Sequence, residues 1–212
     1  MNNDTKLNKA QLALYFIYDS HCPWSYATTP LVNALSDAFP KMQLHLLHCS
    51  HFDGSDSAGL DQVEAVKKCA SVKFGREHVR YANSPKDATK TANLMAWLET
   101  KQPDKLLTVL NAIQKAHFID GNPFTNKHDF SELVSTHKLS PSNKIFRDGL
   151  INDAEQILAG IAEIYEVIGT TSFPALLITV DDQGIFIDHS KFLAAPESVI
   201  ENVLQEMQNL DL

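Results

Sequence analysis

The chain has 212 residues and a formal net charge of −8 at pH 7, from 18 Lys and Arg against 26 Asp and Glu. Its apolar fraction of 44% is ordinary for a globular protein. A chain of this length forms one large domain, or a core domain with an insertion. The acidic balance argues against a nucleic acid or an anionic membrane surface as partner, because both attract clustered Lys and Arg.

The N-terminal segment predicts no targeting signal. Met1 to Gln11 is polar, and the apolar run Leu12–Tyr18 is too short to span a membrane and lacks a signal-peptide cleavage site. Three cysteines, at positions 22, 49 and 69, fit a reducing compartment better than a disulfide framework. We therefore expect a cytoplasmic protein.

The first 50 residues predict a βαβ unit. The β-prone run Leu12–Tyr18 is apolar on both faces, which is typical of a buried strand in a parallel or mixed sheet. An apolar stripe predicts a helix from Pro23 to Phe39, with Pro30 inside it. Residues 42–47 alternate apolar and polar side chains and predict a second strand, which a right-handed crossover joins to the first.

The long middle region predicts helices and no strand. Asp53 to Gly59 is a loop, and Ser84-Pro85 and Ser140-Pro141 indicate helix starts, with Pro near the first turn. Helical spacing of apolar residues predicts five segments, at approximately 61–81, 85–101, 103–118, 127–138 and 142–168.

The C-terminal region returns to strands. Pro174–Val180 predicts a strand, Asp181 to Gly184 a turn, and residues 185–188 the return strand of a hairpin. A last amphipathic helix is predicted from Ala195 to about Asn209.

The order of elements therefore predicts an α/β thioredoxin-like fold, β-α-β … β-β-α, with an all-helical insertion. Residues 1–50 and 169–212 form the thioredoxin-like domain in this interpretation, and residues 51–168 form the inserted helical domain. The insertion is expected over one end of the sheet.

Cys22 is the most promising reactive group. It lies between a buried strand and the first turn of a helix, where unpaired N–H groups and the helix dipole favour a thiolate. We expect a lowered pKa for this thiol, which His21 would lower further if protonated. Ser25 stands one turn later, where its hydroxyl can donate a hydrogen bond to the thiolate. A serine cannot resolve a mixed disulfide, so an external thiol is needed, and glutathione is the obvious cytosolic candidate.

The segment Tyr18-Asp19-x-x-Cys22-Pro23-Trp24-Ser25-Tyr26, followed by Pro30, resembles the DsbA-like thioredoxin superfamily, and within it the FrnE-like branch of cytoplasmic proteins related to protein-disulfide isomerases. The segment from Gly169 to Pro174 resembles the family's segment before its cis-proline strand. The resemblance implies that the Phe173–Pro174 bond is cis, faces Cys22 and pairs with the extended backbone of a substrate. It also implies substrate binding by Pro23 and Trp24, although Trp24 could instead pack against the inserted helices.

This sequence departs from the family pattern at two positions. Ser25 stands where a resolving cysteine is usual, and Phe173 where a smaller residue is usual. The superfamily also contains kappa-class glutathione transferases and hydroxychromene-carboxylate isomerases, with Ser-Pro-Tyr-Ser-like motifs. Cys49 ends the second strand at the same sheet edge as Cys22 and could act as resolving thiol, but we favour a distance too great for a bond. The His48-Cys49-Ser50-His51 spacing matches no usual zinc pattern, so no metal is predicted.

The leading functional hypothesis is a thiol–disulfide oxidoreductase or isomerase acting through one cysteine, with Cys22 and Ser25 as catalytic residues and Pro23, Trp24, Phe173 and Pro174 binding substrate. We predict no tightly bound cofactor and glutathione as co-substrate. The predicted partner is a disulfide-containing or glutathionylated protein or peptide, or a small thiol. The alternatives are a kappa-like glutathione-dependent transferase or isomerase, and a non-catalytic peptide-binding protein.

Overall fold

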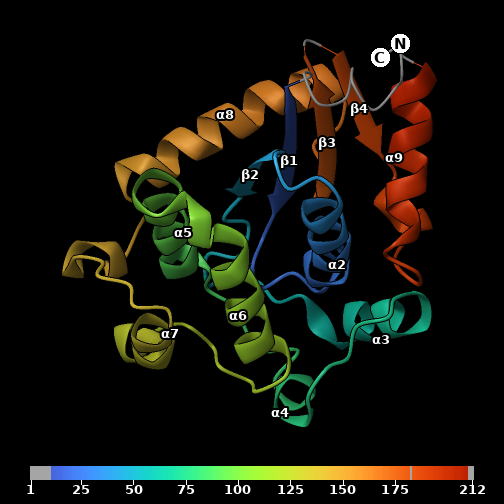
Figure 1. Ribbon diagram of the computed structural model, residues 1–212. Coiled ribbons are helices and arrows are strands. Elements are labelled where there is room, and N and C mark those ends of the chain that lie inside the picture. The colour runs from blue at the N-terminus through green and yellow to red at the C-terminus, as the bar shows by residue number, and fades with distance from the viewer. Residues whose placement is uncertain (1–10, 182, 210–212) are drawn as a thin grey trace.

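A four-stranded mixed sheet forms the centre of the protein in a computed structural model that describes residues 11–181 and 183–209 (Figure 1). Its strand order is β2-β1-β3-β4. The pair β1–β2 is parallel, whereas β1–β3 and β3–β4 are antiparallel. The strands are β1 (Leu12–Tyr18), β2 (Gln43–His48), β3 (Ala175–Val180) and β4 (Gln183–Ile187).

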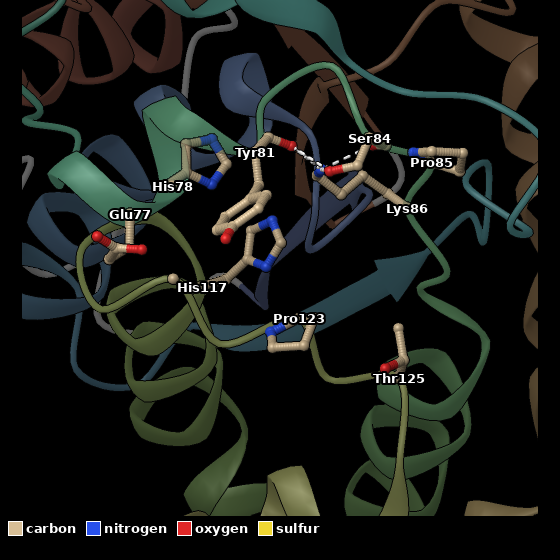
Figure 2. A pocket seen from close by; sticks show the side chains of 10 residues that line it. Glu77, His78, Tyr81, Ser84, Pro85, Lys86, His117, Pro123 and Thr125 are labelled. Atoms are coloured by element: carbon tan, nitrogen blue, oxygen red, sulfur yellow. Dashed lines mark hydrogen bonds between the residues drawn. The ribbon is translucent and has the colours of Figure 1, made fainter.

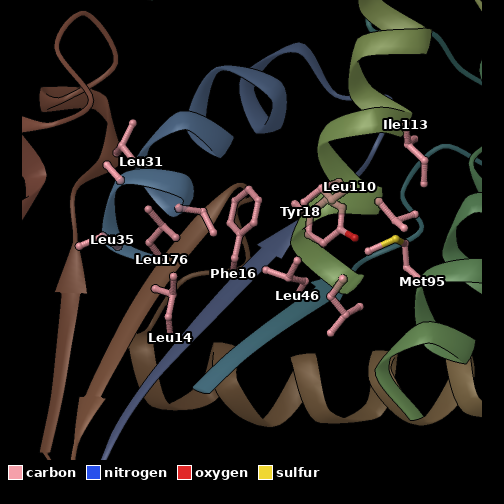
Figure 3. Close-up of a cluster of buried hydrophobic side chains, with 14 of the residues drawn as sticks. Leu14, Phe16, Tyr18, Leu31, Leu35, Leu46, Met95, Leu110, Ile113 and Leu176 are labelled. Carbon is pink, nitrogen blue, oxygen red and sulfur yellow. The ribbon is translucent and has the colours of Figure 1, made fainter. Parts of the chain in front are cut away.

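Strand β1 is central because its side chains are apolar on both faces. Leu14, Phe16 and Tyr18 are fully buried on one face, near Leu31 and Leu35 of helix α2 (Pro23–Ala38) (Figure 3). Helix α9 (Ser198–Asn209) contributes to the same main core. Ile17 faces the other side, in a smaller cluster with Ile161 of helix α8 (Asn152–Ile168). The predicted buried strand is confirmed, and helices lie on both faces of the sheet.

The helices between β2 and β3 form the bulk of the remaining chain (Figure 1). Helix α5 packs against the edge strand β2 and against α6 and α8. These elements are α3 (Gly59–Cys69), α4 (Arg76–Arg80), α5 (Thr89–Lys101), α6 (Leu106–Phe118) and α7 (Ser131–Thr136), with short 3-10 helices at Pro103–Lys105, Lys127–Phe130 and Asn143–Phe146. A further 3-10 helix, His189–Lys191, precedes α9.

Several predicted boundaries are wrong. The segment 61–81 is two helices. Helix α3 ends at Cys69, with extended backbone at Ala70, and α4 begins after Gly75, where a Cβ atom would lie 1.7 Å from the Ile119 carbonyl oxygen. Helix α5 begins at Thr89 and not at Pro85, since Asp87 instead forms an isolated bridge with Asp53. The segment 142–168 is likewise divided, with a 3-10 helix before α8. Strand β4 begins at Gln183, which pairs with Val180.

The predicted fold class is nevertheless confirmed, because the chain is an α/β protein with the order β-α-β, helices, then β-β-α. Helix α8, which the predicted division assigns to the insertion 51–168, packs on the sheet itself. The predicted division remains a prediction, and residues 1–10, 182 and 210–212 lie outside the described residues, with the polar N-terminal segment and one turn position among them. No helix in the described ranges is long and apolar enough to cross a membrane.

Candidate active site

Cys22 lies at the carboxyl edge of the sheet, where β1 leads into α2. It is the N-cap residue of α2, with extended backbone angles (φ −85°, ψ 122°), and Pro23 occupies the first helical turn. The Cys22 N–H donates to the Asp19 carbonyl at 3.1 Å, which closes a tight turn after the strand. The sequence therefore places the thiol at a helix N-terminus as predicted.

Asp19 and Ser25 fix the conformation around the thiol. The buried Asp19 carboxylate accepts hydrogen bonds from the backbone N–H groups of His21 (2.8 Å) and Phe52 (3.1 Å). The Asp19 N–H donates to Ser25 Oγ at 3.2 Å. With this lone pair occupied, the Ser25 hydroxyl proton is available to Cys22, and both the hydroxyl and the backbone N–H of Ser25 act to lower the pKa of the Cys22 thiol.

Burial has a larger effect on the pKa of the Cys22 thiol than those hydrogen bonds. Cys22 is only 4% exposed, and burial raises the pKa of its thiol to about 11, with the Asp19 charge adding a smaller increase. The expectation of a lowered pKa is therefore wrong for this arrangement, because desolvation of the sulfur exceeds the effect of the helix N-terminus.

The predicted substrate-binding residues lie close to Cys22. The Phe173–Pro174 bond is cis, and the antiparallel pairing of Ala175 with Ile17 places Pro174 at the level of Tyr18, the last residue of β1. Trp24 and Phe173 pack against a small cluster that contains Cys22, Phe52, Ala58 and Ala88. The structure thus gathers Cys22, Pro23, Trp24, Ser25, Phe173 and Pro174 at one edge of the sheet.

Cys49 lies at the same edge, but its surroundings differ. Its N–H donates to the Tyr18 carbonyl at 2.7 Å, and its side chain packs with Ile17 and Ile161 on the α8 side of the sheet. Burial raises the pKa of its thiol, and the Cys22 thiol contributes a smaller increase. All three cysteines carry free thiols, with Cys69 exposed on α3.

His21 is neutral and cannot stabilise a thiolate by charge. Burial lowers its pKa to about 4. Its Nε2 donates to the Pro123 carbonyl at 3.1 Å, and its Nδ1 lies 2.9 Å from Ser20 Oγ. The carbonyl can only accept, so Nδ1 is the unprotonated nitrogen. The condition under which His21 would lower the pKa of Cys22, a protonated ring, is therefore not met at pH 7.

Sequence reasoning missed a cluster of buried histidines behind this junction. Ser20 Oγ lies 2.8 Å from His48 Nε2, which connects β2 to His21. The His21 ring lies 4.1 Å from that of His117, which in turn lies 5.0 Å from the ring of His78. These residues are scattered in the sequence, and no local spacing reveals their contact. The described residues contain no group of three or more His, Cys, Asp or Glu side chains that could hold a metal ion.

The protein has a thioredoxin-like fold of the DsbA type. Its marks are the sheet order, the helix that follows Cys22 and the helical segment between β2 and β3. No protein-family model matches the chain, and no curated protein matches it in sequence.

Solved structures supply the particular likenesses. The chain is similar to the cytosolic disulfide reductase DsbM from Pseudomonas aeruginosa, with a TM-score of 0.74 and 18% identity over 91% of this chain and 98% of that one. The same protein with GSH gives a TM-score of 0.72 and 19% identity, over 91% and 99%. A candidate protein disulfide isomerase from Nitrosomonas europaea gives a TM-score of 0.72 and 14% identity, over 94% and 98%. Identities this low establish the fold.

Proposed function

We propose that this protein is a thiol–disulfide oxidoreductase that acts through Cys22 and uses glutathione as the resolving thiol. The observation that carries the proposal is the placement of a thiol at the N-terminus of α2, beside a cis-proline, with the Ser25 hydroxyl and N–H directed to the sulfur. The likeness to disulfide reductases supports it, and one of those neighbours was solved with GSH.

The reaction balances in two exchanges. The Cys22 thiolate attacks one sulfur of the substrate disulfide, which forms a mixed disulfide and releases the other sulfur as a thiolate. A glutathione thiolate then attacks the mixed disulfide, which frees Cys22 and carries the substrate sulfur away bound to glutathione. Ser25 takes no part in the exchange itself, since it has no sulfur. Its hydroxyl stabilises the Cys22 thiolate before the first step and after the second.

The high pKa of Cys22 limits the fraction of thiolate available for the first exchange. With a pKa of about 11, only about one molecule in ten thousand carries the thiolate at pH 7. Because burial is the main cause, a substrate that separates Trp24 and Phe173 and admits polar groups to the sulfur would lower this pKa and activate the thiol.

The substrate-binding surface in this proposal combines Pro23 and Trp24 of α2 with Phe173 and Pro174 before β3. The backbone beside Pro174 pairs with an extended peptide, and the aromatic rings form the walls of the groove. The partner is therefore a disulfide-containing or glutathionylated peptide or protein, or a small thiol. A cytoplasmic location is part of the proposal, supported by the cytosolic location named for DsbM.

The test is a mass-spectrometric map of the reduced protein after brief exposure to oxidised glutathione. We expect an adduct on Cys22, no adduct there in Cys22→Ser, and an unchanged Cys22 adduct in the control Cys69→Ser. A Cys22–Cys49 disulfide would contradict the single-cysteine mechanism. An unmodified Cys22 at pH 9 would remove the oxidoreductase proposal.

The buried, high-pKa thiol favours a second candidate, a non-catalytic protein that binds peptides in the same groove. Peptide binding that survives Cys22→Ser, together with an unreactive Cys22, would support that candidate over the enzyme.

A further inference from the structure

His51 lies beside two aromatic residues near Cys22, one from the loop after β2 and one from the cis-proline segment. Its ring centroid is 4.9 Å from that of Phe173, at an interplanar angle of 51°, and 4.9 Å from that of Phe52, edge to face. Phe52 belongs to the cluster that contains Cys22, and Phe173 packs against that cluster. His51 itself is exposed. One aromatic ring therefore separates an exposed imidazole from the cluster around the thiol.

The backbone around His51 is tied to the core on both sides of the ring. Ser50 has a left-handed conformation (φ 46°), which is uncommon for a residue with a side chain, and its N–H donates to His48 Nδ1 at 3.0 Å. Burial raises the pKa of the Asp19 carboxyl, and the backbone N–H of His51 is one of the groups that act against this rise. The fold therefore fixes the place of the imidazole beside the turn that precedes Cys22.

The ring nitrogens of His51 are open to a ligand. Among the described residues, neither nitrogen has a hydrogen-bond partner, and no ion pair joins His51 to Asp53. The Oδ1 atom of Asp53 instead accepts hydrogen bonds from the hydroxyl and the N–H of Ser55. These bonds lower the pKa of Asp53, and the His51 ring adds a smaller decrease. An imidazole and a carboxylate are thus electrostatic neighbours that do not occupy each other's polar atoms.

Other carboxylates lie on the same side of Cys22. Residues 52–56 and 86–88 pair as a short ladder, in which Asp53 forms an antiparallel bridge with Asp87. The ladder carries the side chains of Asp53, Asp56 and Asp87. A ligand with negative charge alone would be repelled by them.

Lys86 of the same ladder is directed elsewhere. Its ammonium donates to the carbonyls of Tyr81 and Ser84, each at 2.7 Å, beside a separate cavity of about 360 Å³ (Figure 2). The cis-proline segment 169–174 carries no charged residue. On this segment and the ladder with its preceding residue, His51 is therefore the one side chain besides Lys86 that can carry positive charge.

We propose that His51 and Asp53 bind the γ-glutamyl end of the glutathione that reacts at Cys22. This end carries an α-carboxylate, to which the imidazole N–H donates, beside an α-ammonium, which donates to Asp53 Oδ2. One peptide unit and short methylene chains separate these groups from the glutathione sulfur, which suits a site one aromatic ring away from the Cys22 cluster. The proposal rests on the proposed function, because it assigns the residues that recognise glutathione at the same site.

The test compares oxidised glutathione with bis(2-hydroxyethyl) disulfide, which is neutral and has no amino-acid end. In both reactions the Cys22 thiolate attacks one sulfur and the S–S bond breaks. One half remains on Cys22 as a mixed disulfide and the other leaves as a thiolate. Mass spectrometry at pH 8 gives the rate of Cys22 modification by each disulfide. The ratio of the glutathione rate to the neutral rate is then compared between variants, which cancels differences in thiol reactivity.

His51→Phe keeps a ring against Phe52 and Phe173 but removes the donor and the charge. It should lower the ratio about fivefold, as expected for an exposed charged contact, and leave the rate with the neutral disulfide unchanged, which also shows that the variant is folded. His51→Lys, which restores a cation without the ring, should recover much of the ratio. Asp53→Asn should lower the ratio too, because it removes the partner of the ammonium. His128→Phe, at an exposed histidine outside the groove, is the matched control and should change neither rate.

Two results would overturn the proposal and leave the reactivity of Cys22 intact. One is an equal ratio in the wild type and His51→Phe, and the other is a higher ratio in Asp53→Asn, which would mean that this carboxylate only repels glutathione. If neither disulfide modifies Cys22 in the wild type, the proposed function itself fails, and this proposal fails with it.

Discussion

The Cys22 junction and the histidine cluster are adjacent buried regions in which the same physical effect acts in opposite directions. Burial raises the pKa of Cys22 to about 11 and lowers the pKa of His21 to about 4 and of His48 to about 3. In both regions the neutral form is favoured, because desolvation penalises whichever form is charged. The difference lies in their partners. The thiol is surrounded by apolar side chains, whereas the histidines are connected through Ser20 and backbone carbonyls.

The two regions differ in what must move before a buried group can become charged. Around Cys22, two of the packed side chains, Trp24 and Phe173, are themselves only partly buried. The histidines are held by segments far apart in the sequence, so charging them requires disruption of several elements together.

The largest expected effect is a loss of stability in acid. His21, His48 and His78 have folded-state pKa values below the ordinary 6.5, so the unfolded chain binds more protons as the pH falls. Their contribution to stability is complete above pH 6.5 and is lost as the pH falls towards 4. Each histidine should reduce the free energy of unfolding by about 1.4 kcal/mol per pH unit in this range. Urea titrations between pH 7 and 4.5 measure it.

Asp19 acts in the opposite sense, since burial raises its pKa and its protonation stabilises the folded state at lower pH. A His128→Gln control should keep the full pH dependence. A free energy of unfolding that stays constant from pH 7 to 4.5 would show that the histidines are not buried as described.

The variant Asp19→Asn should affect the two regions differently, because it makes the Cys22 thiol easier to ionise and the His21 ring harder to protonate. Removing the charge should lower the pKa of Cys22, which the carboxylate raises, and should also lower the pKa of His21 further below 4. The variant should lose about 1–3 kcal/mol of stability, because the amide group faces a backbone N–H where the carboxylate accepted one. The pH profile of Cys22 alkylation and urea unfolding provide both readouts. Asp37→Asn, at an exposed position on α2, is the control.

Should the alkylation profile of Cys22 in Asp19→Asn move to higher pH, the assigned sign of the Asp19 effect would be wrong.

The smallest expected effect comes from Ser25→Ala. Loss of the hydroxyl should raise the pKa of Cys22 further and slow its alkylation at pH 8 by up to about tenfold, which corresponds to about 1.4 kcal/mol. Ser36→Ala, further along α2, should have no effect. An unchanged rate in Ser25→Ala would mean that the hydroxyl does not contact the sulfur.

The strands and the helix that build the junction could be predicted from the sequence because their signals are local. The run Leu12–Tyr18 is apolar on both faces, and Pro23 marks the start of α2 within one turn. The break between α3 and α4 could not be predicted, since Gly75, the residue before α4, closely approaches Ile119, a residue of a different segment.

The chemistry of the site was harder to predict than its position. The sequence places Cys22 at a helix N-terminus, where the local effect lowers a thiol pKa, but the larger effect comes from Phe52, Ala58, Ala88 and Phe173, which only the fold brings to the sulfur. The contacts among His21, His78 and His117 have the same origin, so no spacing in the sequence indicates them.

The two neighbours of the central strand have a consequence for how the chain acquires its structure. Phe16 pairs with Leu46 on one side and with Leu176 on the other, so β1 gains its second partner only after the whole helical segment has been synthesised. Contacts between such distant residues slow folding and leave one edge of β1 exposed in a nascent chain. A ribosome-bound fragment ending before β3 should therefore bind a chaperone that recognises unpaired apolar strands, and should be released once residues beyond 180 emerge.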